Sequence, residues 1–126
     1  MKGIPARILV VEDDEDTSFL LKKALSEAGY VVESCMTGSG IVEFRHAWPD
    51  LFILDKHLPT IDGLALAKFL RLHDATRDIP IIMISAYPIK AKAIQVGIDE
   101  FVAKPFCMDV FLRIVDRCIH SVHHGE

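Results

Sequence analysis

Four short apolar runs in this sequence each end in a side chain that can do chemistry. These side chains are, in chain order, the carboxylates of Glu12 and Asp13, the carboxylate of Asp55, the hydroxyl of Ser85 and the amine of Lys104. Apolar runs of this length, bounded by turn residues, predict buried strands. Because the carboxyl ends of parallel strands form the ligand crevice of an open sheet, we expect these groups to meet in one polar site.

Carboxylates gathered at one sheet edge would repel one another. Two like charges about 4 Å apart repel by roughly 4 kcal/mol at an effective dielectric near 20. Lys104 would supply one positive charge, and a hard divalent cation would supply the rest. Oxygen ligands suit Mg²⁺ (or Mn²⁺) better than zinc. The alternative is a solvated acidic rim with one surface ion pair. It would explain any single acid, but not a hydroxyl and an amine that end two further strands.

Composition and charge limit the class of protein. A chain of 126 residues with 51% hydrophobic residues is long enough for one domain with its own core. The net charge of −4 and the lack of a Lys/Arg cluster argue against a nucleic-acid surface on this chain. Three cysteines with no Cys-x-x-Cys pair indicate a reduced, cytoplasmic protein. The apolar runs are too short to span a membrane, so we expect no membrane association.

Strands and helices are predicted to alternate along the chain. A helix should begin near Asp16 and stop at Gly29, with Leu20, Leu21 and Leu25 on its apolar side. Further helices are expected from Gly38 to before Pro49, from Leu64 to Leu72, and from Ile89 to Val96. The last helix has the clearest apolar stripe, made of Val110, Phe111, Ile114, Val115, Cys118, Ile119 and Val122. This alternation predicts an α/β fold with a parallel sheet covered on both faces.

Several short motifs occur together in one order along the sequence. They are Val11-Glu12-Asp13-Asp14, Asp55 followed by Pro59 and Asp62-Gly63, Ser85-Ala86, and Lys104-Pro105-Phe106. Together they resemble the receiver domain of two-component response regulators, from about Arg7 to Val122. The resemblance implies a flavodoxin-like doubly wound sheet of five parallel strands, in the order 2-1-3-4-5, with five helices. It also implies that residues 1–126 form a single receiver domain with its core at about 7–122.

The resemblance implies a role for each site residue. Asp55 would accept a phosphoryl group from a phosphohistidine on a sensor histidine kinase or a histidine phosphotransfer protein. Asp13, Asp55 and the backbone carbonyl of His57 would hold Mg²⁺, and Glu12 would act through a bound water. Lys104 and Ser85 would contact the phosphoryl group, and Ser85 with Phe101 would form the switch. Such a domain is a signalling phosphoacceptor that assists its own phosphoryl transfer and hydrolysis, and it is not an enzyme in the usual sense.

The sequence departs from the family pattern in several places. Phe101 stands where the family often has Tyr, and Cys107 stands where a polar residue would cap the last helix. The segment from Ser85 to Gly97 is roughly one helical turn short, which predicts a shortened fourth helix. Few residues remain after the last helix. We therefore expect no effector domain in this chain and an output through binding to a downstream effector, which the sequence does not identify.

Two alternatives to a phosphoacceptor receiver stay open at this point. The first is a degenerate receiver that acts as a constitutive interaction module, against which the intact acids, Ser85 and Lys104 argue. The second is a hydrolase of the haloacid dehalogenase type with an Asp nucleophile. Those phosphatases place a second acid two residues after the nucleophile, where this sequence has His57.

Overall fold

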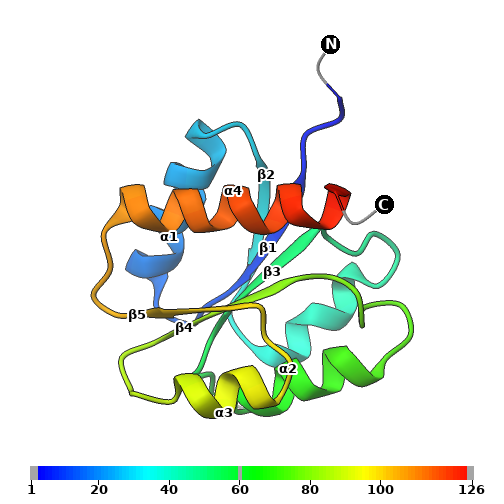
Figure 1. Cartoon of the computed structure of the whole chain (residues 1–126), viewed down its shortest axis with the longest axis vertical. Helices are drawn as coiled ribbons and strands as arrows, with labels where there is room; N and C mark the ends of the chain where they lie inside the picture. The colour runs from blue at the N-terminus through cyan, green and yellow to red at the C-terminus, as the bar shows by residue number, and fades with distance from the viewer. Residues whose placement is uncertain (1–2, 60, 125–126) are drawn as a thin grey trace.

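The strands form one parallel five-stranded sheet in the order β2-β1-β3-β4-β5 (Figure 1). The computed structural model describes residues 3–59 and 61–124, without the side chains of 122–124. The strands are β1 (Arg7–Val11), β2 (Val31–Cys35), β3 (Leu51–Asp55), β4 (Ile81–Ser85) and β5 (Glu100–Ala103). The helical elements are α1 (Glu15–Glu27), η1 (Gly38–Phe44), α2 (Gly63–Leu72), α3 (Lys90–Gln95) and α4 (Met108–His124). The predicted doubly wound α/β fold and its strand order are confirmed.

Two of the five helical elements differ from a regular α-helix of ordinary length. The second, η1, is a 3₁₀ helix of seven residues that ends at Phe44, earlier than expected. Gly38 and Gly40 weaken α-helix formation there, while the Thr37 hydroxyl accepts a hydrogen bond from the Gly40 N–H at 3.3 Å. The fourth, α3, has only six residues, so the predicted shortening is confirmed.

The first helix begins at Glu15, slightly before the predicted start. Asp14 is its N-cap, because its carboxylate accepts hydrogen bonds from the Thr17 N–H at 2.8 Å and the Thr17 hydroxyl at 2.6 Å. These bonds, the hydroxyl's foremost, lower the pKa of Asp14. The helix ends before Gly29, whose φ of +102° lies in the left-handed region that favours glycine.

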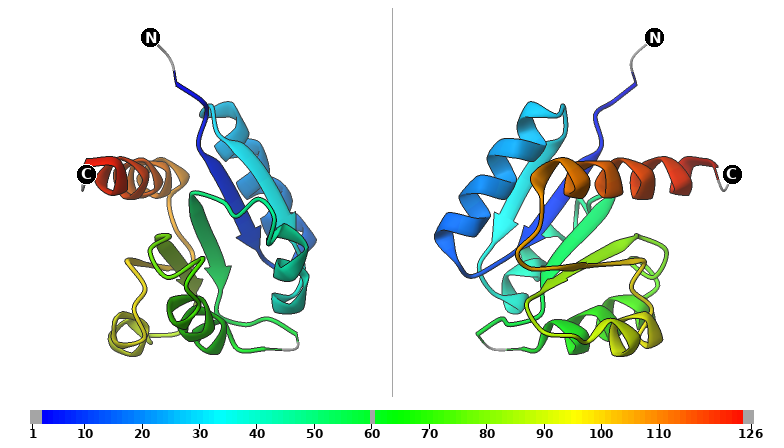
Figure 2. Two further views of the ribbon diagram at one scale, coloured as in Figure 1. Left: turned by 90° about the vertical axis from the view of Figure 1, so that its right-hand side faces the viewer. Right: turned by 60° about the vertical axis from the view of Figure 1, so that its left-hand side comes forward.

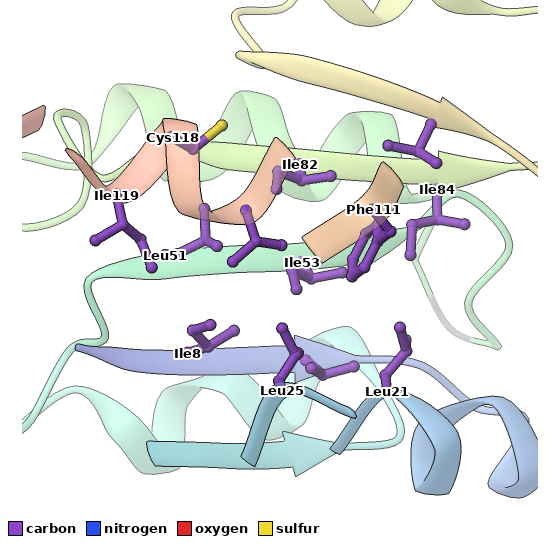
Figure 3. Packing of buried hydrophobic residues seen from close by; sticks show 13 residues of the cluster. Ile8, Leu21, Leu25, Leu51, Ile53, Ile82, Ile84, Phe111, Cys118 and Ile119 are labelled. Carbon is purple, nitrogen blue, oxygen red and sulfur yellow. The ribbon is translucent and has the colours of Figure 1, made fainter. Parts of the chain in front are cut away.

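The sheet is buried on both faces, which explains why its strands are continuous apolar runs. Figure 1 shows α1 and α4 on one side of the sheet and α2 and α3 on the other. Alternate strand residues point to opposite faces. Figure 3 shows the face under α1 and α4, where Leu21, Leu25 and Phe111 approach the strand residues Ile53 and Ile84. The other face contains Leu9, Phe52, Leu54, Ile81 and Met83, which pack with residues of η1, α2 and α3.

The apolar faces of the helices are narrower than the sequence predicted. In α4, Phe111, Val115, Cys118 and Ile119 are buried, but Val110 is exposed. Leu20 of α1 is exposed as well. Both residues lie at the margin of a helical stripe that contacts the sheet along its centre. The predicted stripe also includes Val122, whose side chain lies outside the described part of the chain.

The short α3 segment is tied to α2 by one arginine. The Arg71 guanidinium donates hydrogen bonds to the carbonyls of Ile79 at 2.6 Å and Gly97 at 2.7 Å, and it pairs with Asp99 at 2.6 Å. These bonds hold the loops that lead into β4 and β5. Among residues 3–59 and 61–124, no helix combines the length and the apolar character that crossing a bilayer requires.

Candidate functional site

The strand register brings the predicted site residues to one edge of the sheet. Val11 of β1 pairs with Leu54 of β3, so the residues that follow them, Glu12 and Asp55, lie side by side. Ser85 pairs with Ala103 of β5, the residue before Lys104. Figure 2 shows the strand arrowheads directed to the same side of the molecule. The parallel register therefore brings residues from four separate motifs into one site.

Three carboxylates form the centre of this site. Oxygen atoms of Glu12, Asp13 and Asp55 all lie within 4.8 Å of one another. Glu12 is 2% exposed and Asp55 is 7% exposed, whereas Asp13 faces solvent. A buried carboxylate is costly unless a cation or hydrogen-bond donors compensate it. The cluster therefore requires positive charge.

Lys104 supplies part of that charge. Its ammonium nitrogen lies 3.4 Å from Glu12 Oε1 and 3.7 Å from Asp55 Oδ2. One lysine cannot balance the three acids, so the cluster favours a further cation beside Asp13. Mg²⁺ binds to carboxylate oxygens and keeps several of its own water ligands. A carboxylate cluster that is partly open to solvent leaves room for those waters. The residues present therefore fit a Mg²⁺ site.

The environment of Glu12 favours its protonated form when no metal is bound. Burial first, and then the hydrogen bond and the negative charge of Asp55, raise the pKa of Glu12 to about 7. The Asp14 N–H, 3.1 Å from Glu12 Oε2, and Lys104 act in the opposite direction. Without a cation, a proton on Glu12 relieves the repulsion among the acids.

This raised pKa predicts a pH-dependent stability of the metal-free protein. The unfolded chain releases the Glu12 proton near the ordinary value of 4.5, while the folded protein keeps it up to about 7. The contribution to the free energy of unfolding is therefore full below the unfolded pKa and is lost as the pH rises through the folded value. We expect a loss of roughly 2 kcal/mol between about pH 5 and about pH 8.

Urea unfolding in the presence of a metal chelator measures this effect. Glu12→Gln cannot ionise, so its stability should change less over the same pH range than that of the wild type. Equal pH dependence in the two proteins would contradict the assignment to Glu12.

The loop after β3 holds Asp55 close to the start of α2. The His57 N–H donates to Asp55 Oδ1 at 3.3 Å, and the Gly63 N–H donates to the Lys56 carbonyl at 2.8 Å. A Cβ atom at position 63 would lie only 2.4 Å from the Asp55 carbonyl oxygen. Glycine is therefore needed for close approach of the two backbones, although its φ is ordinary.

A second contact in this loop was not anticipated from the sequence. The Lys56 ammonium pairs with Asp62 at 2.7 Å, and Asp62 caps α2 through the Leu64 N–H at 2.7 Å. These bonds lower the pKa of Asp62 against the opposing effect of its burial. An opposite-charge pair six positions apart in a loop has no periodic signature, so only the Asp-Gly turn signal pointed to this region.

The remaining predicted residues lie on β4, on β5 and directly after β3. Ser85 is buried, and its hydroxyl accepts a hydrogen bond from the Tyr87 N–H at 3.0 Å. Phe101 is partly buried against the cluster that contains Met83, its partner in the β4–β5 register. The rings of His57 and Tyr87 form an edge-on pair with centroids 4.7 Å apart. The loops that follow Asp55 and Ser85 thus contact each other through two aromatic rings.

Comparison with known proteins identifies the family. Residues 8–116 match the response regulator receiver domain. The chain belongs to this family. As a receiver domain, it is a signalling phosphoacceptor rather than a classical enzyme, and its acidic pocket resembles the Mg²⁺-binding phosphoacceptor site of such domains.

Solved receiver structures resemble this fold closely. A putative response regulator from Chloroflexus aurantiacus J-10-fl is 30% identical, with a TM-score of 0.88 over 93% of this chain and 99% of that one. The receiver domain of the sensor histidine kinase PA1611 from Pseudomonas aeruginosa PAO1 is 27% identical, with a TM-score of 0.83 over 93% of this chain and 99% of that one. That structure has a magnesium ion coordinated in its active-site cleft.

Curated relatives are longer than this chain. The DNA-binding dual master transcriptional regulator RpaA of a Synechocystis strain is 33% identical over 95% of this chain and 54% of its own length. The phosphate regulon regulatory protein PhoB of Rhizobium meliloti is 36% identical over 79% of this chain and 46% of its own. The chain thus spans about half the length of these two relatives and corresponds to their receiver part.

Proposed function

We propose that this chain is the phosphoacceptor receiver of a two-component or phosphorelay system and that Asp55 accepts the phosphoryl group. The donor is a phosphohistidine on a sensor histidine kinase or a histidine phosphotransfer protein. The observation that carries this proposal is the placement of the buried Asp55 carboxylate beside Glu12, Asp13 and the Lys104 ammonium. Residues 1–126 then act as a single receiver unit with its core at about 7–122.

The transfer is a displacement at phosphorus. An Asp55 carboxylate oxygen forms the new P–O bond as the P–N bond to the donor histidine breaks, and the product is an acyl phosphate. Lys104 lies 3.7 Å from Asp55 Oδ2, so its charge offsets the negative charge on the phosphoryl oxygens. Because phosphoryl transfer depends mainly on positioning and charge stabilisation, no separate acid or base is required.

The acids of the pocket would hold the metal. Asp13, Asp55 and the backbone carbonyl of His57 are the proposed direct ligands of Mg²⁺ (or Mn²⁺), and Glu12 acts through a bound water. When bound, the cation neutralises charge on the phosphoryl oxygens. His57 lies next to Asp55 through the hydrogen bond from its own N–H, which supports its place in this set.

Ser85 and Phe101 form the proposed switch. Ser85 donates its hydroxyl hydrogen to a phosphoryl oxygen and draws the loop after β4 inward, which gives Phe101 space to change rotamer. Phenylalanine has no hydroxyl, so the switch acts through packing alone. The altered surface then binds a downstream effector, and this chain is not expected to bind nucleic acid or membrane by itself.

Beryllofluoride, a phosphoryl mimic, tests the proposed function. Adding it with Mg²⁺ should shift the amide NMR signals of the loops after β3 and β4. An unchanged spectrum would favour a degenerate receiver that acts without phosphorylation. Sustained turnover of a simple phosphate ester would instead favour the dehalogenase-type hydrolase, for which His57 is the wrong residue.

The aromatic pair beside the site is expected to lengthen the lifetime of the acyl phosphate. Tyr87 contacts the His57 ring edge-on, and the two rings come from the loops that carry Asp55 and Ser85. We expect Tyr87 to shield the acyl phosphate from water. Tyr87→Ala should therefore lose its phosphoryl group several times faster than the wild type, in a range up to roughly tenfold.

Release of inorganic phosphate from the phosphorylated protein measures this rate. Tyr87→Phe keeps the ring and should behave as the wild type does. Loss at an equal or slower rate in Tyr87→Ala would count against shielding.

A further inference from the structure

A groove between η1 and α2 is not explained by the phosphoacceptor site. It consists of a hollow of about 340 Å³ next to Trp48 and an adjoining hollow of about 320 Å³ next to Ile61. Both hollows are lined by Ile41, Val42 and Phe69, so they form one continuous depression. In Figure 1, η1 in turquoise and α2 in green lie on the same side of the sheet. Each hollow has the volume of a small-molecule pocket, which is about 300–1,000 Å³.

The two walls of the groove present apolar side chains to solvent. Val42 of η1 is 50% exposed and Phe69 of α2 is 53% exposed. In a 3₁₀ helix, residues three positions apart lie in one row, so Val42 and Arg45 share a face. On α2, Phe69 and the following His73 lie four positions apart, and their ring centroids are 5.9 Å from each other. Each wall therefore continues from an apolar side chain to a basic one.

At one end of the groove, basic side chains lie without acidic side chains beside them in the lining of the described residues. Arg45, His46 and His73 line the larger hollow, and no acidic side chain of the described residues lines either hollow. Within the described part of the chain, no carboxylate lies within 4.0 Å of the Arg45 guanidinium. Arginine stays charged at all physiological pH values. Although the chain has a net charge of −4, Arg45 therefore places a positive charge at one end of the apolar groove.

The geometry points to a binding site for an organic carboxylate with an apolar body, such as a medium-chain fatty acid. The body would lie along Ile41, Val42 and Phe69, and the carboxylate would accept hydrogen bonds from Arg45, with the two histidines beside it. Apolar lining with a few polar groups at one end is typical of sites that fix the orientation of a small ligand. A charged hydrogen bond from arginine to a carboxylate supplies the specificity for an anion.

Decanoate, kept below its micelle concentration, is the probe for this site. Trp48 is the sole tryptophan and lines the larger hollow, so its fluorescence should change saturably on binding. Amide NMR shifts should map to η1 and α2. Arg45→Gln should weaken binding by about tenfold. Arg113→Gln is the matched control, because Arg113 is also exposed but lies on α4, on the other face of the sheet.

Decanol, which has the same chain without the charge, should bind more weakly than decanoate. The inference is overturned by any of three results. These are no saturable response by either method, shifts that map away from η1 and α2, or equal affinities for decanoate and decanol that Arg45→Gln leaves unchanged.

Discussion

Asp55→Asn is expected to abolish labelling of the protein by the small phosphodonor acetyl phosphate. The amide keeps the shape of the side chain, but its oxygen is a much weaker nucleophile than the carboxylate. Asp55 lies within the acidic cluster and 3.7 Å from the Lys104 ammonium, which can offset the charge of an incoming phosphoryl group. Intact-mass spectrometry after incubation with Mg²⁺ should show a phosphoryl adduct on the wild type and none on the variant.

A matched substitution elsewhere controls for nonspecific effects. Asp78 is an exposed acid outside the acidic cluster, and Asp78→Asn should be labelled as the wild type is. Asp55→Asn should also keep the far-ultraviolet circular dichroism of the wild type, because removing a negative charge from a crowded acidic cluster does not destabilise it. A phosphoryl adduct of equal yield on Asp55→Asn would show that another residue is the acceptor.

Asp13→Ala should lose most of the Mg²⁺ affinity. Asp13 is the exposed member of the acidic cluster, and it is the acid that a hydrated cation reaches with the least desolvation. Glu12 is buried, and in the proposed ligand set it acts through water, so Glu12→Gln should weaken Mg²⁺ binding by only about tenfold, as outer-shell substitutions do. The loss in Asp13→Ala should be larger, because this variant removes a proposed direct ligand.

Isothermal titration calorimetry with MgCl₂ gives the order of these affinities. Above the Glu12 pKa of about 7, both variants remove one negative charge from the cluster, so the titrations are run there and the change in net charge is matched between them. A larger loss in Glu12→Gln than in Asp13→Ala would reverse the proposed ligand assignment.

The fold and most of the site could be predicted because they depend on short local signals. Strands buried on both faces appear as apolar runs, and each run ends at its functional residue. No further sequence signal is needed to bring these residues together, because parallel pairing aligns the ends of neighbouring strands. Motif order along the chain indicated the family, and the family determines the strand order.

Features that depend on contacts between distant segments could not be predicted. The approach of Gly63 to the Asp55 carbonyl, the Lys56–Asp62 pair and the contact of the His57 and Tyr87 rings have no periodic signature. The 3₁₀ geometry of η1 was missed because its apolar spacing also fits an α-helix. In the structure, η1 forms one wall of the groove beside α2.

Borohydride trapping tests the central claim most directly. The reagent reduces an aspartyl phosphate to homoserine, and peptide mass spectrometry then locates the modified position. After incubation of the wild type with acetyl phosphate and Mg²⁺, we expect homoserine at position 55 alone. Homoserine at Asp13, or a stable phosphoryl group on a hydroxyl or histidine side chain instead, would contradict the assignment of Asp55 as the phosphoacceptor.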